Sequence, residues 1–287
     1  MFFKEQRREN AAKKIKGNPK VSIIIPNKDK TELLKPCIES IRKLTTYQNY
    51  EIVIVENNSE DKKTFDIYEE LCALTQVRLL TYPHKEFNYQ KIINFAVRDC
   101  GTDFILQLNN DTELITPNWL ELLIGYAQQP SIGAVGVKLL YPDMTIQHVG
   151  GILMQEVPYA SHVYRGIPRD VNLSKNLSQK AQSISWVTGA CIMSRKEIYQ
   201  KVGFMDENFV YNYGDVDYCL KIRAIKKEVI INPLVELIHL ESKTRPGDEI
   251  PEILEISTRD AKLFYEKWAD ELEKGDRYIN TRLLVMN

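Results

Sequence analysis

The chain has 287 residues, 44% of them hydrophobic and 27% charged, which is the composition of a globular protein with enough length for a full core. Its formal net charge of −1 argues against a nucleic-acid partner, because binding phosphates requires an excess of basic residues. No apolar run reaches the roughly 18 residues of a membrane span, and there is no signal-peptide pattern. The five cysteines form no C-x-x-C pair. We therefore expect a cytoplasmic protein with reduced thiols.

The first twenty residues form a basic segment. Residues 2–20 begin with Phe2 and Phe3, and they carry seven lysine or arginine side chains against two glutamates. This pattern fits a solvated helix or tail, or an amphipathic segment that rests on an anionic membrane surface. We expect the solvated segment, with a peripheral contact at the inner face of the plasma membrane as the alternative.

Residues 21–140 alternate between strand-like and helix-like segments. Continuous apolar runs of strand length occur at residues 21–26, 51–56, 77–82, 103–108 and 133–140. Helical spacing predicts helices over residues 34–44, up to about Leu74, over 89–99 and from Pro117 onward. Pro36 fits only the first turn of the first helix, because proline lacks the N–H of a helix interior. Apolar strands without alternation, separated by helices, predict an α/β fold with a mostly parallel sheet covered on both faces.

The second half of the chain is less regular. Residues 141–169 are rich in turns and short strands, and residues 170–182 are a polar stretch that predicts a loop. Residues 211–227 predict a helix with acidic residues at its start and basic residues towards its end, the order that the helix dipole favours. A strand and a charged loop follow, and a helical extension that contains Trp268 begins at about Pro251.

Polar side chains follow the fourth apolar run in "ILQLNNDTEL", where Asn109, Asn110 and Asp111 come directly after the strand. Open parallel sheets bind ligands at the carboxyl ends of their strands. Such oxygen ligands suit a hard divalent cation that shares its shell with a diphosphate, whereas the alternative is an Asx turn that caps the next helix. The chain has no G-x-G-x-x-G, P-loop or G-x-S-x-G motif. The sequence therefore gives no support for a dinucleotide site, a P-loop nucleotide site or the nucleophile elbow of a hydrolase.

Further candidates lie later in the chain. Asp215 and Asp217, in "YGDVDYCL", are two residues apart near a helix start and point in different directions, so they cannot both serve one site. One of them could act as a general base in a cleft, or cap the helix. His239 follows the late strand, although most single histidines are neither ligands nor bases. Lys243 and Arg245, in the loop beyond, could bind phosphate or be solvated.

Eight stretches together resemble bacterial family 2 glycosyltransferases of the GT-A fold, closest to the branch that builds O-antigen, rhamnan and other surface polysaccharides. They are "VSIIIPNKDKTELLKPCIESI", "YEIVIVENNSED", "FNYQKIINFA", "LQLNNDTELITPNWL", "GAVGVKLLYPDMTIQHVGG", "VTGACIMSRKEIYQKVGFMDENF", "YGDVDYCLKIR" and "HLESKTR". The tail "FYEKWADELEKGDRYINTRLL" is similar as well, so the resemblance covers about residues 20–283.

This resemblance implies an inverting hexosyltransferase that depends on a divalent cation, Mn²⁺ or Mg²⁺. It implies transfer of a sugar in one displacement from a UDP- or dTDP-linked donor to a hydroxyl of a glycan acceptor. We expect a lipid-linked glycan in surface-polysaccharide synthesis, with a glycosylated protein as the alternative acceptor. Nucleic acid is not an expected partner, and the oligomeric state stays open.

The family motifs also imply roles for individual residues. Asp215 falls on the position of the catalytic base, and Asp111 and His239 fall on the metal ligands. Positions that border the donor nucleotide, its diphosphate or its sugar are Pro26, Asn27, Asp29, Glu56, Lys91, Asn94, Asn109, Asn110, Gly189, Ala190, Lys243 and Arg245. Trp186 and Asp217 are expected on the acceptor side, with a structural role as the alternative for Asp217.

The resemblance divides the chain into three predicted parts. Residues 1–20 are the basic N-terminal segment, residues 21–250 are the GT-A domain, and residues 251–287 are a C-terminal helical extension. Within the domain, residues 21–115 are the nucleotide-binding half and residues 116–250 the acceptor and catalytic half, which contains a smaller mixed part.

Two departures from the family pattern keep other functions open. Asn109 replaces an acid, and Gly214 stands where many members have glutamate or asparagine. A catalytically degenerate partner subunit is therefore the alternative function. A nucleotidyltransferase is disfavoured, because it should carry a glycine- and arginine-rich loop after the first strand, where this chain has "PNKDK".

Overall fold

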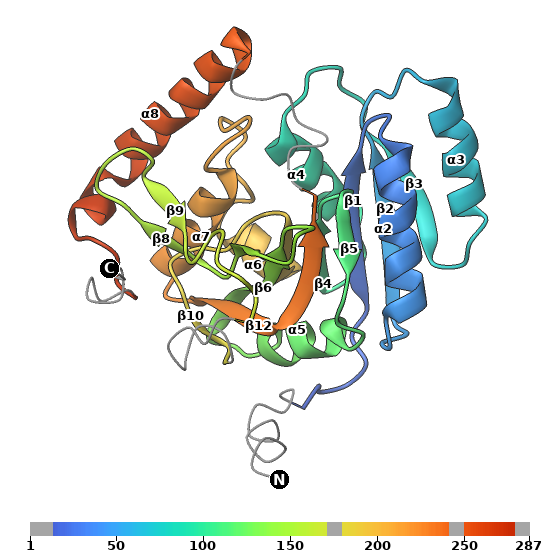
Figure 1. Ribbon diagram of the computed structural model, residues 1–287, viewed down its shortest axis with the longest axis horizontal. Helices are drawn as coiled ribbons and strands as arrows, with labels where there is room; N and C mark the ends of the chain where they lie inside the picture. Colours follow the sequence, from blue (N-terminus) through green and yellow to red (C-terminus); the bar gives the residue numbers. More distant parts are fainter. Residues whose placement is uncertain (1–13, 171–179, 241–249, 279–287) are drawn as a thin grey trace.

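The structure is a computed structural model that describes residues 14–170, 180–240 and 250–278 (Figure 1). Its strands are β1 (Val21–Asn27), β2 (Tyr50–Glu56), β3 (Val77–Thr81), β4 (Phe104–Leu108), β5 (Thr112–Leu114), β6 (Ile132–Leu140), β7 (Ile146–His148), β8 (Gly151–Leu153), β9 (Ala160–His162), β10 (Gln182–Ser183), β11 (Cys191–Arg195) and β12 (Glu228–His239). Its helices are α2 (Thr31–Leu44), α3 (Lys62–Cys72), α4 (Tyr89–Asp99), α5 (Trp119–Ala127), α6 (Lys196–Lys201), α7 (Gly214–Ala224) and α8 (Pro251–Glu273).

A ten-stranded sheet forms the centre of the molecule. Its main path runs β10-β12-β6-β11-β4-β1-β2-β3, with β5 paired to β12 and β7 paired to β6. Strands β4, β1, β2 and β3 are parallel, as are β6 and β12, whereas β11 is antiparallel to both β4 and β6. Strands β8 and β9 form a separate two-stranded sheet. The predicted mixed, mostly parallel α/β architecture is confirmed.

Both faces of the central sheet are buried, which explains the lack of alternation in its strands. Along β1, Ile23 and Ile25 pack into one core cluster with residues of α2 and α5, while Ile24 packs into a second cluster with residues of α4 and α7. A strand that is covered on both sides needs apolar residues at every position. The continuous apolar runs in the sequence are therefore the direct consequence of this layering.

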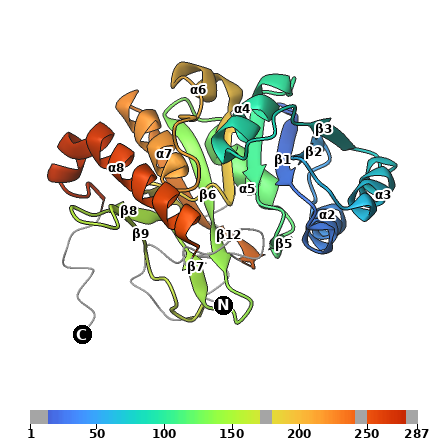
Figure 2. The same cartoon turned by 90° about the horizontal axis from the view of Figure 1, so that it is seen from above.

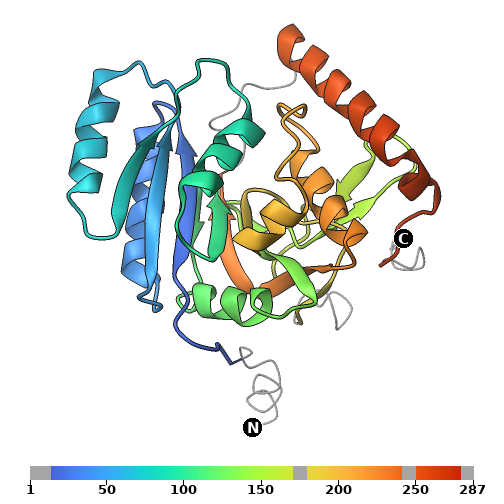
Figure 3. The same ribbon diagram turned by 180° about the vertical axis from the view of Figure 1, so that it is seen from behind.

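The C-terminal helix α8 packs on the half of the molecule that is farthest from α3. The views from above and from behind show it alongside α7 and next to β8 and β9 (Figure 2, Figure 3). Phe264 anchors it, since this side chain is fully buried and stacks on Tyr213 with ring centroids 4.7 Å apart. No helix in the described parts of the chain is both long enough and apolar enough to cross a membrane.

Most predicted element boundaries differ from the structure by two residues or fewer, but the position of Pro36 was wrong. Helix α2 begins at Thr31, and its first i to i−4 hydrogen bond runs from the Leu34 N–H to the Lys30 carbonyl. Pro36 therefore lies in the second turn of α2. The helix tolerates this proline because Leu34, Cys37 and other residues bury one face of it in the core.

Two further expectations concern α5 and the polar stretch. Helix α5 begins at Trp119 rather than at Pro117, with Asn118 as its N-cap residue. Most of the polar stretch 170–182 lies outside the described residues, but its last residue belongs to β10, where Gln182 pairs with Ile231 of β12.

A buried ion network ties the segment after β9 to the sheet. Glu236 on β12 accepts hydrogen bonds from Lys138 Nζ at 3.0 Å and from the Arg169 guanidinium at 2.5 and 3.2 Å. Only 4% of the Lys138 side chain is exposed. Burial alone would raise the pKa of Glu236, but the hydrogen bonds from Arg169 and Lys138 outweigh it, so the pKa of this carboxyl lies below its usual range.

We predict that Glu236→Gln lowers the free energy of unfolding by about 1–3 kcal/mol, because Lys138 then lies buried without a counter-ion. A carboxyl with a depressed folded-state pKa stabilises the fold above the ordinary glutamate pKa of 4.5, and this stabilisation is lost as the pH falls through the folded-state value. Thermal unfolding of both proteins over a pH series should show a difference that shrinks below pH 4.5. A difference that does not change with pH would contradict the assignment.

Candidate active site

A cavity of about 1300 Å³ opens at the carboxyl ends of β1 and β4. One wall comes from the ends of these strands, with Pro26, Asn27, Asn109 and Asn110 among its residues. The opposite wall is built from the β8–β9 loop, the segment before α7 and one side of α8. Residues distant in the sequence thus meet at the edge where open α/β sheets bind ligands.

Two asparagines connect the tips of β1 and β4. The Asn27 side-chain oxygen accepts a hydrogen bond from Asn110 Nδ2 at 2.6 Å, and Asn27 Nδ2 donates to the Tyr68 hydroxyl at 2.8 Å. Both asparagines are buried and line the cavity together with Pro26 and Lys28. The predicted donor-side residues Pro26, Asn27 and Asn110 are thus brought together at one place.

Two other predicted donor-side residues lie behind this wall and shape its loops. Asp29 has a positive φ of 58°, and its Oδ1 accepts the backbone N–H groups of Glu60 at 2.8 Å and Asp61 at 3.0 Å. The buried Glu56 carboxylate accepts the backbone N–H of Asn58 at 3.0 Å and that of Ser59. Neither carboxylate is among the residues that line the cavity.

Two residues predicted to border the nucleotide lie on α4. Asn94 is buried, and its amide is hydrogen-bonded within the protein: its Nδ2 donates to the Met205 carbonyl and to Glu207 Oε1, both at 2.9 Å, and its Oδ1 accepts the Met205 N–H at 3.0 Å. Asn94 is not among the residues that line the cavity. Lys91 lies on the same helix and is not among the cavity-lining residues either.

Asp111, shortly after β4, and His239, the last residue of β12, lie against each other, and neither is among the residues that line the cavity. Their Oδ1 and Nε2 atoms are 3.1 Å apart, and Asn109 Nδ2 lies 3.3 Å from the same nitrogen. The other ring nitrogen, Nδ1, is 2.5 Å from Gln147 Oε1. Because Gln147 Nε2 donates to the His239 carbonyl at 3.2 Å, its oxygen must face Nδ1 and accept a proton from it.

This tautomer points the lone pair of His239 Nε2 at the Asp111 carboxylate. Asp111 Oδ1 is buried and has no hydrogen-bond partner among the described residues. Two electron-rich atoms that face each other need a proton or a cation between them. The donor set of one carboxylate and one imidazole suits a divalent metal ion. No group of three or more histidine, cysteine, aspartate or glutamate side chains with metal-site geometry occurs among the described residues.

Asp215 lies at the start of α7 in the middle of the cavity wall. Its Oδ2 accepts the Gly189 N–H at 2.8 Å, and its Oδ1 accepts the Val216 N–H at 2.9 Å. Burial raises the pKa of Asp215, although the hydrogen bonds from Gly189 and Val216 partly offset this effect. The carboxylate is thus fixed in orientation and has a higher proton affinity than an exposed aspartate.

Asp217 points away from the cavity, as its spacing from Asp215 predicted. It is fully buried, and its Oδ1 accepts hydrogen bonds from Trp268 Nε1 at 2.9 Å and Lys267 Nζ at 2.7 Å. Asp217 is thus bonded within the protein and is not among the residues that line the cavity. The N-cap residue of α7 is Tyr213, in a left-handed conformation, so neither aspartate occupies the N-cap position.

Trp186 and His162 line the end of the cavity opposite Asn109, and His148 packs against both of them. The Trp186 indole N–H donates to the Ile152 carbonyl at 3.0 Å, and its ring centroid lies 4.9 Å from that of His162. His148 is fully buried and does not line the cavity. Its Nδ1 lies 2.9 Å from His162 Nδ1, and its Nε2 accepts the Thr188 N–H at 3.2 Å. Burial lowers the pKa of His148 well below the usual value, which keeps its ring neutral.

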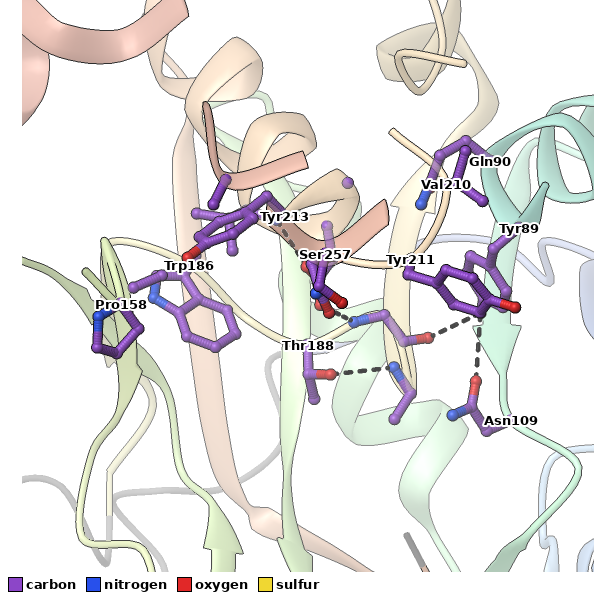
Figure 4. A pocket seen from close by; sticks show the side chains of 18 of the residues that line it. Tyr89, Gln90, Asn109, Pro158, Trp186, Thr188, Val210, Tyr211, Tyr213 and Ser257 are labelled. Carbon is purple, nitrogen blue, oxygen red and sulfur yellow. Dashed lines mark hydrogen bonds between the residues drawn. The ribbon is translucent and has the colours of Figure 1, made fainter. Parts of the chain in front are cut away.

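Aromatic side chains also line the cavity, and the sequence did not single them out. They include Tyr159, Tyr211 and Tyr213, and the ring of Tyr211 packs on that of Phe87 with centroids 5.3 Å apart. Figure 4 shows Tyr89, Gln90 and Asn109 on one side of the cavity and Pro158 and Trp186 on the other. Only the frequency of "Y" in "YNYGD" could have indicated this wall from the sequence.

Gly189 and Ala190, which were predicted to lie beside the donor sugar, line the cavity. A Cβ on Gly189 would meet its nearest neighbour, Asp215 Cβ, at an ordinary contact distance of 3.5 Å. The protein itself therefore does not demand glycine here, and the open space beside Gly189 is available to a ligand. Lys243 and Arg245, the remaining predicted phosphate contacts, lie outside the described residues.

Helix α8 holds the segment before Asp215 in place. The carboxylate of Asp260 is completely buried, and its Oδ2 accepts three consecutive backbone N–H groups, those of Val210, Tyr211 and Asn212, at 3.0, 2.8 and 3.0 Å. This segment lines the cavity and leads into α7. The C-terminal extension therefore contributes to the geometry of the site, which an isolated aspartate in a helical pattern did not reveal.

Comparison with known proteins now defines the class of protein. The family "Glycosyl transferase family 2" matches residues 22–203, more than half of the chain. The chain belongs to this family, and the resemblance seen in its motifs is confirmed.

Curated relatives point to the same branch. The chain is 36% identical over 274 residues to the O-antigen biosynthesis protein RfbC of Myxococcus xanthus, covering 94% of this chain and 21% of that protein. It is 21% identical over 195 residues to the dTDP-rhamnosyl transferase RfbF of Shigella flexneri, covering 67% of this chain and 60% of the relative. The chain thus spans about a fifth of the length of the first relative and less than two thirds of the second.

Solved structures show the same fold at low sequence identity. GalNAc-T7 with UDP, GalNAc and Mn²⁺ superposes with a TM-score of 0.65 at 14% identity, over 85% of this chain and 48% of that one. The mannosyltransferase PcManGT from Pyrobaculum calidifontis with GDP-Man and Mn²⁺ gives a TM-score of 0.58 at 14% identity, over 94% and 82%. These neighbours confirm the GT-A fold.

We predict that Asp260→Ala frees the segment 210–212, because three backbone N–H groups lose their common acceptor. Amide hydrogen exchange of this segment should accelerate by about tenfold or more, since even one lost hydrogen bond is worth about 1 kcal/mol. Asp260→Asn retains one oxygen that can accept these bonds and should restore most of the protection. Unchanged exchange in Asp260→Ala would show that other contacts hold the segment.

Proposed function

We propose that the protein is an inverting, metal-dependent glycosyltransferase that moves a sugar from a nucleoside-diphosphate donor to a hydroxyl of a glycan acceptor. The observation that carries this proposal is the shared cavity. It places the polar tips of β1 and β4, an aspartate with a raised pKa and an aromatic wall around one space. A nucleotide sugar and an acceptor glycan could occupy its two ends, with Asp215 between them.

Asp215 is the general base of this proposal. The acceptor hydroxyl loses its proton to a carboxylate oxygen of Asp215 while its own oxygen attacks the anomeric carbon. The bond between that carbon and the diphosphate oxygen breaks on the opposite face, so the configuration inverts and the nucleoside diphosphate leaves with the bonding electron pair. The raised pKa of Asp215 supports this role, because a base works best when its pKa approaches the working pH.

Asp111 and His239 are the residues that would hold a divalent cation, Mn²⁺ or Mg²⁺. The Asp111 Oδ1 and His239 Nε2 atoms face each other at 3.1 Å, and Asp111 Oδ1 has no hydrogen-bond partner among the described residues, which fits such an ion. When bound, the cation supplies charge neutralisation for the diphosphate. The hydrogen bond that His239 Nδ1 donates to Gln147 Oε1 keeps the ring in the tautomer that a metal ligand needs. Asn109 supplies an amide where many family members have an acid.

The far half of the cavity supports a carbohydrate acceptor. Tyrosine and tryptophan rings offer flat apolar faces together with hydrogen-bonding edges, which suits the alternating faces and hydroxyls of sugars. Trp186 keeps its proposed place on this side. The names of the relatives favour synthesis of a bacterial surface polysaccharide. The basic residues 1–20 support a lipid-linked glycan at an anionic membrane surface and a cytoplasmic location.

We predict that Asp215→Asn lowers the rate of transfer by about 10² to 10⁴, because the amide cannot take the proton of the acceptor hydroxyl. The amide oxygen can still accept the Gly189 N–H, so the local structure and the affinity for the nucleoside diphosphate should stay near normal. Release of nucleoside diphosphate under saturating donor and acceptor measures the rate of transfer. Calorimetric titration with the nucleoside diphosphate measures the affinity.

Asp217→Asn is the matched control, since this residue lies on the same helix but outside the cavity. It should lower the melting temperature and leave most transfer intact. If Asp215→Asn weakened nucleotide binding as much as turnover, Asp215 would be part of the binding site and not the base.

A further inference from the structure

Gln90, in the first turn of α4, has a buried carbonyl oxygen without a partner. Only 2% of the residue is exposed, and it lines the cavity. Its Oε1 has no hydrogen-bond partner among the described residues. Buried amide oxygens are nearly always paired, so an unpaired one in a cavity wall marks a position where a ligand can donate a hydrogen bond.

The side chain of Gln90 fills the space above Gly214, the first residue of α7. A Cβ on Gly214 would lie 2.2 Å from Gln90 Nε2, 2.3 Å from Cδ and 2.7 Å from Oε1, all closer than real atoms approach. The backbone φ of Gly214 is not in the left-handed region, so space and not backbone conformation requires glycine here. The departure of Gly214 from the family pattern is therefore matched by Gln90, which occupies the place of the missing side chain next to Asp215.

The position of Gln90 relative to Asp215 identifies the part of the substrate that it faces. The neighbouring Tyr89 hydroxyl contacts Asn109 Oδ1 at 3.2 Å and the Gly189 carbonyl at 3.4 Å, which holds the start of α4 against the tip of β4. In Figure 4, Gln90 lies on the side of Tyr89 and Asn109, away from Trp186 and Pro158. Gln90 is thus on the donor side of the base.

We propose that Gln90 Oε1 accepts a hydrogen bond from a hydroxyl or amide N–H of the sugar being transferred, and that it thereby selects the donor sugar. This inference rests on the proposed function. A carbonyl oxygen can only accept, so the site requires an O–H or N–H at the facing position of the sugar. A donor that lacks this group leaves the oxygen buried and unpaired, and the enzyme rejects it.

The test compares the wild type with Gln90→Met, which keeps the length of the side chain and removes the acceptor. The probes are UDP-glucose, UDP-galactose, UDP-N-acetylglucosamine, dTDP-rhamnose and GDP-mannose, followed by the single-deoxy derivatives of whichever sugar the wild type hydrolyses or transfers fastest. One deoxy derivative should lose about 10- to 100-fold in kcat/KM with the wild type. Gln90→Met should lose the same factor on the parent sugar and nothing further on that derivative.

The affinity for the bare nucleoside diphosphate, which has no sugar, separates this inference from the proposed function. Gln90→Met should bind it as the wild type does. If the variant binds the nucleotide normally but discriminates among the deoxy sugars exactly as the wild type does, the role of Gln90 is overturned while the proposed function stands. If the wild type binds no nucleotide and turns over no donor, both are overturned.

Gly214→Ala gives an independent test of the contact. Its Cβ should displace the Gln90 carboxamide, lower the melting temperature and reproduce the loss of sugar selectivity. In a Gln90→Ala background the new methyl group has room, so the same substitution should cost little or no stability. Equal melting-temperature losses in both backgrounds would show that Gln90 does not occupy this space.

Discussion

Strand β11 is the constraint on which the site depends, because it joins the two halves of the central sheet. It pairs antiparallel with β4 along one edge and with β6 along the other. Gly189 and Ala190 directly precede it, and the Ala190 carbonyl accepts the Asn109 N–H at 3.0 Å. Backbone pairing therefore sets the polar tip of β4 beside the segment whose Gly189 N–H holds Asp215. A site built on paired strands keeps its geometry better than one built on loops alone.

The side chains around this junction form two groups. The first group lines the cavity, and the second group fixes the loops that carry cavity-lining residues. Asn27, Asn109 and Asp215 belong to the first group. Asp29 and Asp260 belong to the second, since each uses a carboxylate to gather consecutive backbone N–H groups of a loop. Several charge-assisted hydrogen bonds offset the cost of burying the Asp260 carboxylate. Helix α8 is thus part of the framework that shapes the cavity, although the family match ends before it.

Much of the nucleotide-side fold could be predicted from the sequence. Unalternating runs such as residues 21–26 indicated strands buried on both faces, and β1 indeed packs into two core clusters. The polar residues after β4 were predicted to lie at a ligand-binding edge, because open parallel sheets bind ligands at the carboxyl ends of their strands. Roles for Asp111, Asp215 and His239 came from the family resemblance; the structure supplies their neighbours, and the roles themselves stay proposals.

Other parts of the site could not be predicted, because they depend on contacts between distant segments. His148 and Trp186 become neighbours only when β7 and the segment before β11 fold together. The pairing of Gln90 with Gly214 depends on how closely α4 approaches α7. Asn94 looked like a nucleotide contact by position, yet the chain from Met205 to Glu207 occupies its amide. Local periodicity carries no information on such tertiary contacts.

The measurement that tests the central claim most directly is a thermal-shift series with UDP, dTDP and GDP, each with and without Mn²⁺, and with His239→Ala as the control protein. A nucleotide at about 100 times its dissociation constant adds roughly 2.7 kcal/mol to the free energy of unfolding. We expect one nucleotide to stabilise the wild type only when Mn²⁺ is present, and His239→Ala to lose this dependence. If no nucleotide stabilised the wild type, or if stabilisation were the same without metal, a metal-dependent donor site at Asp111 and His239 would be contradicted.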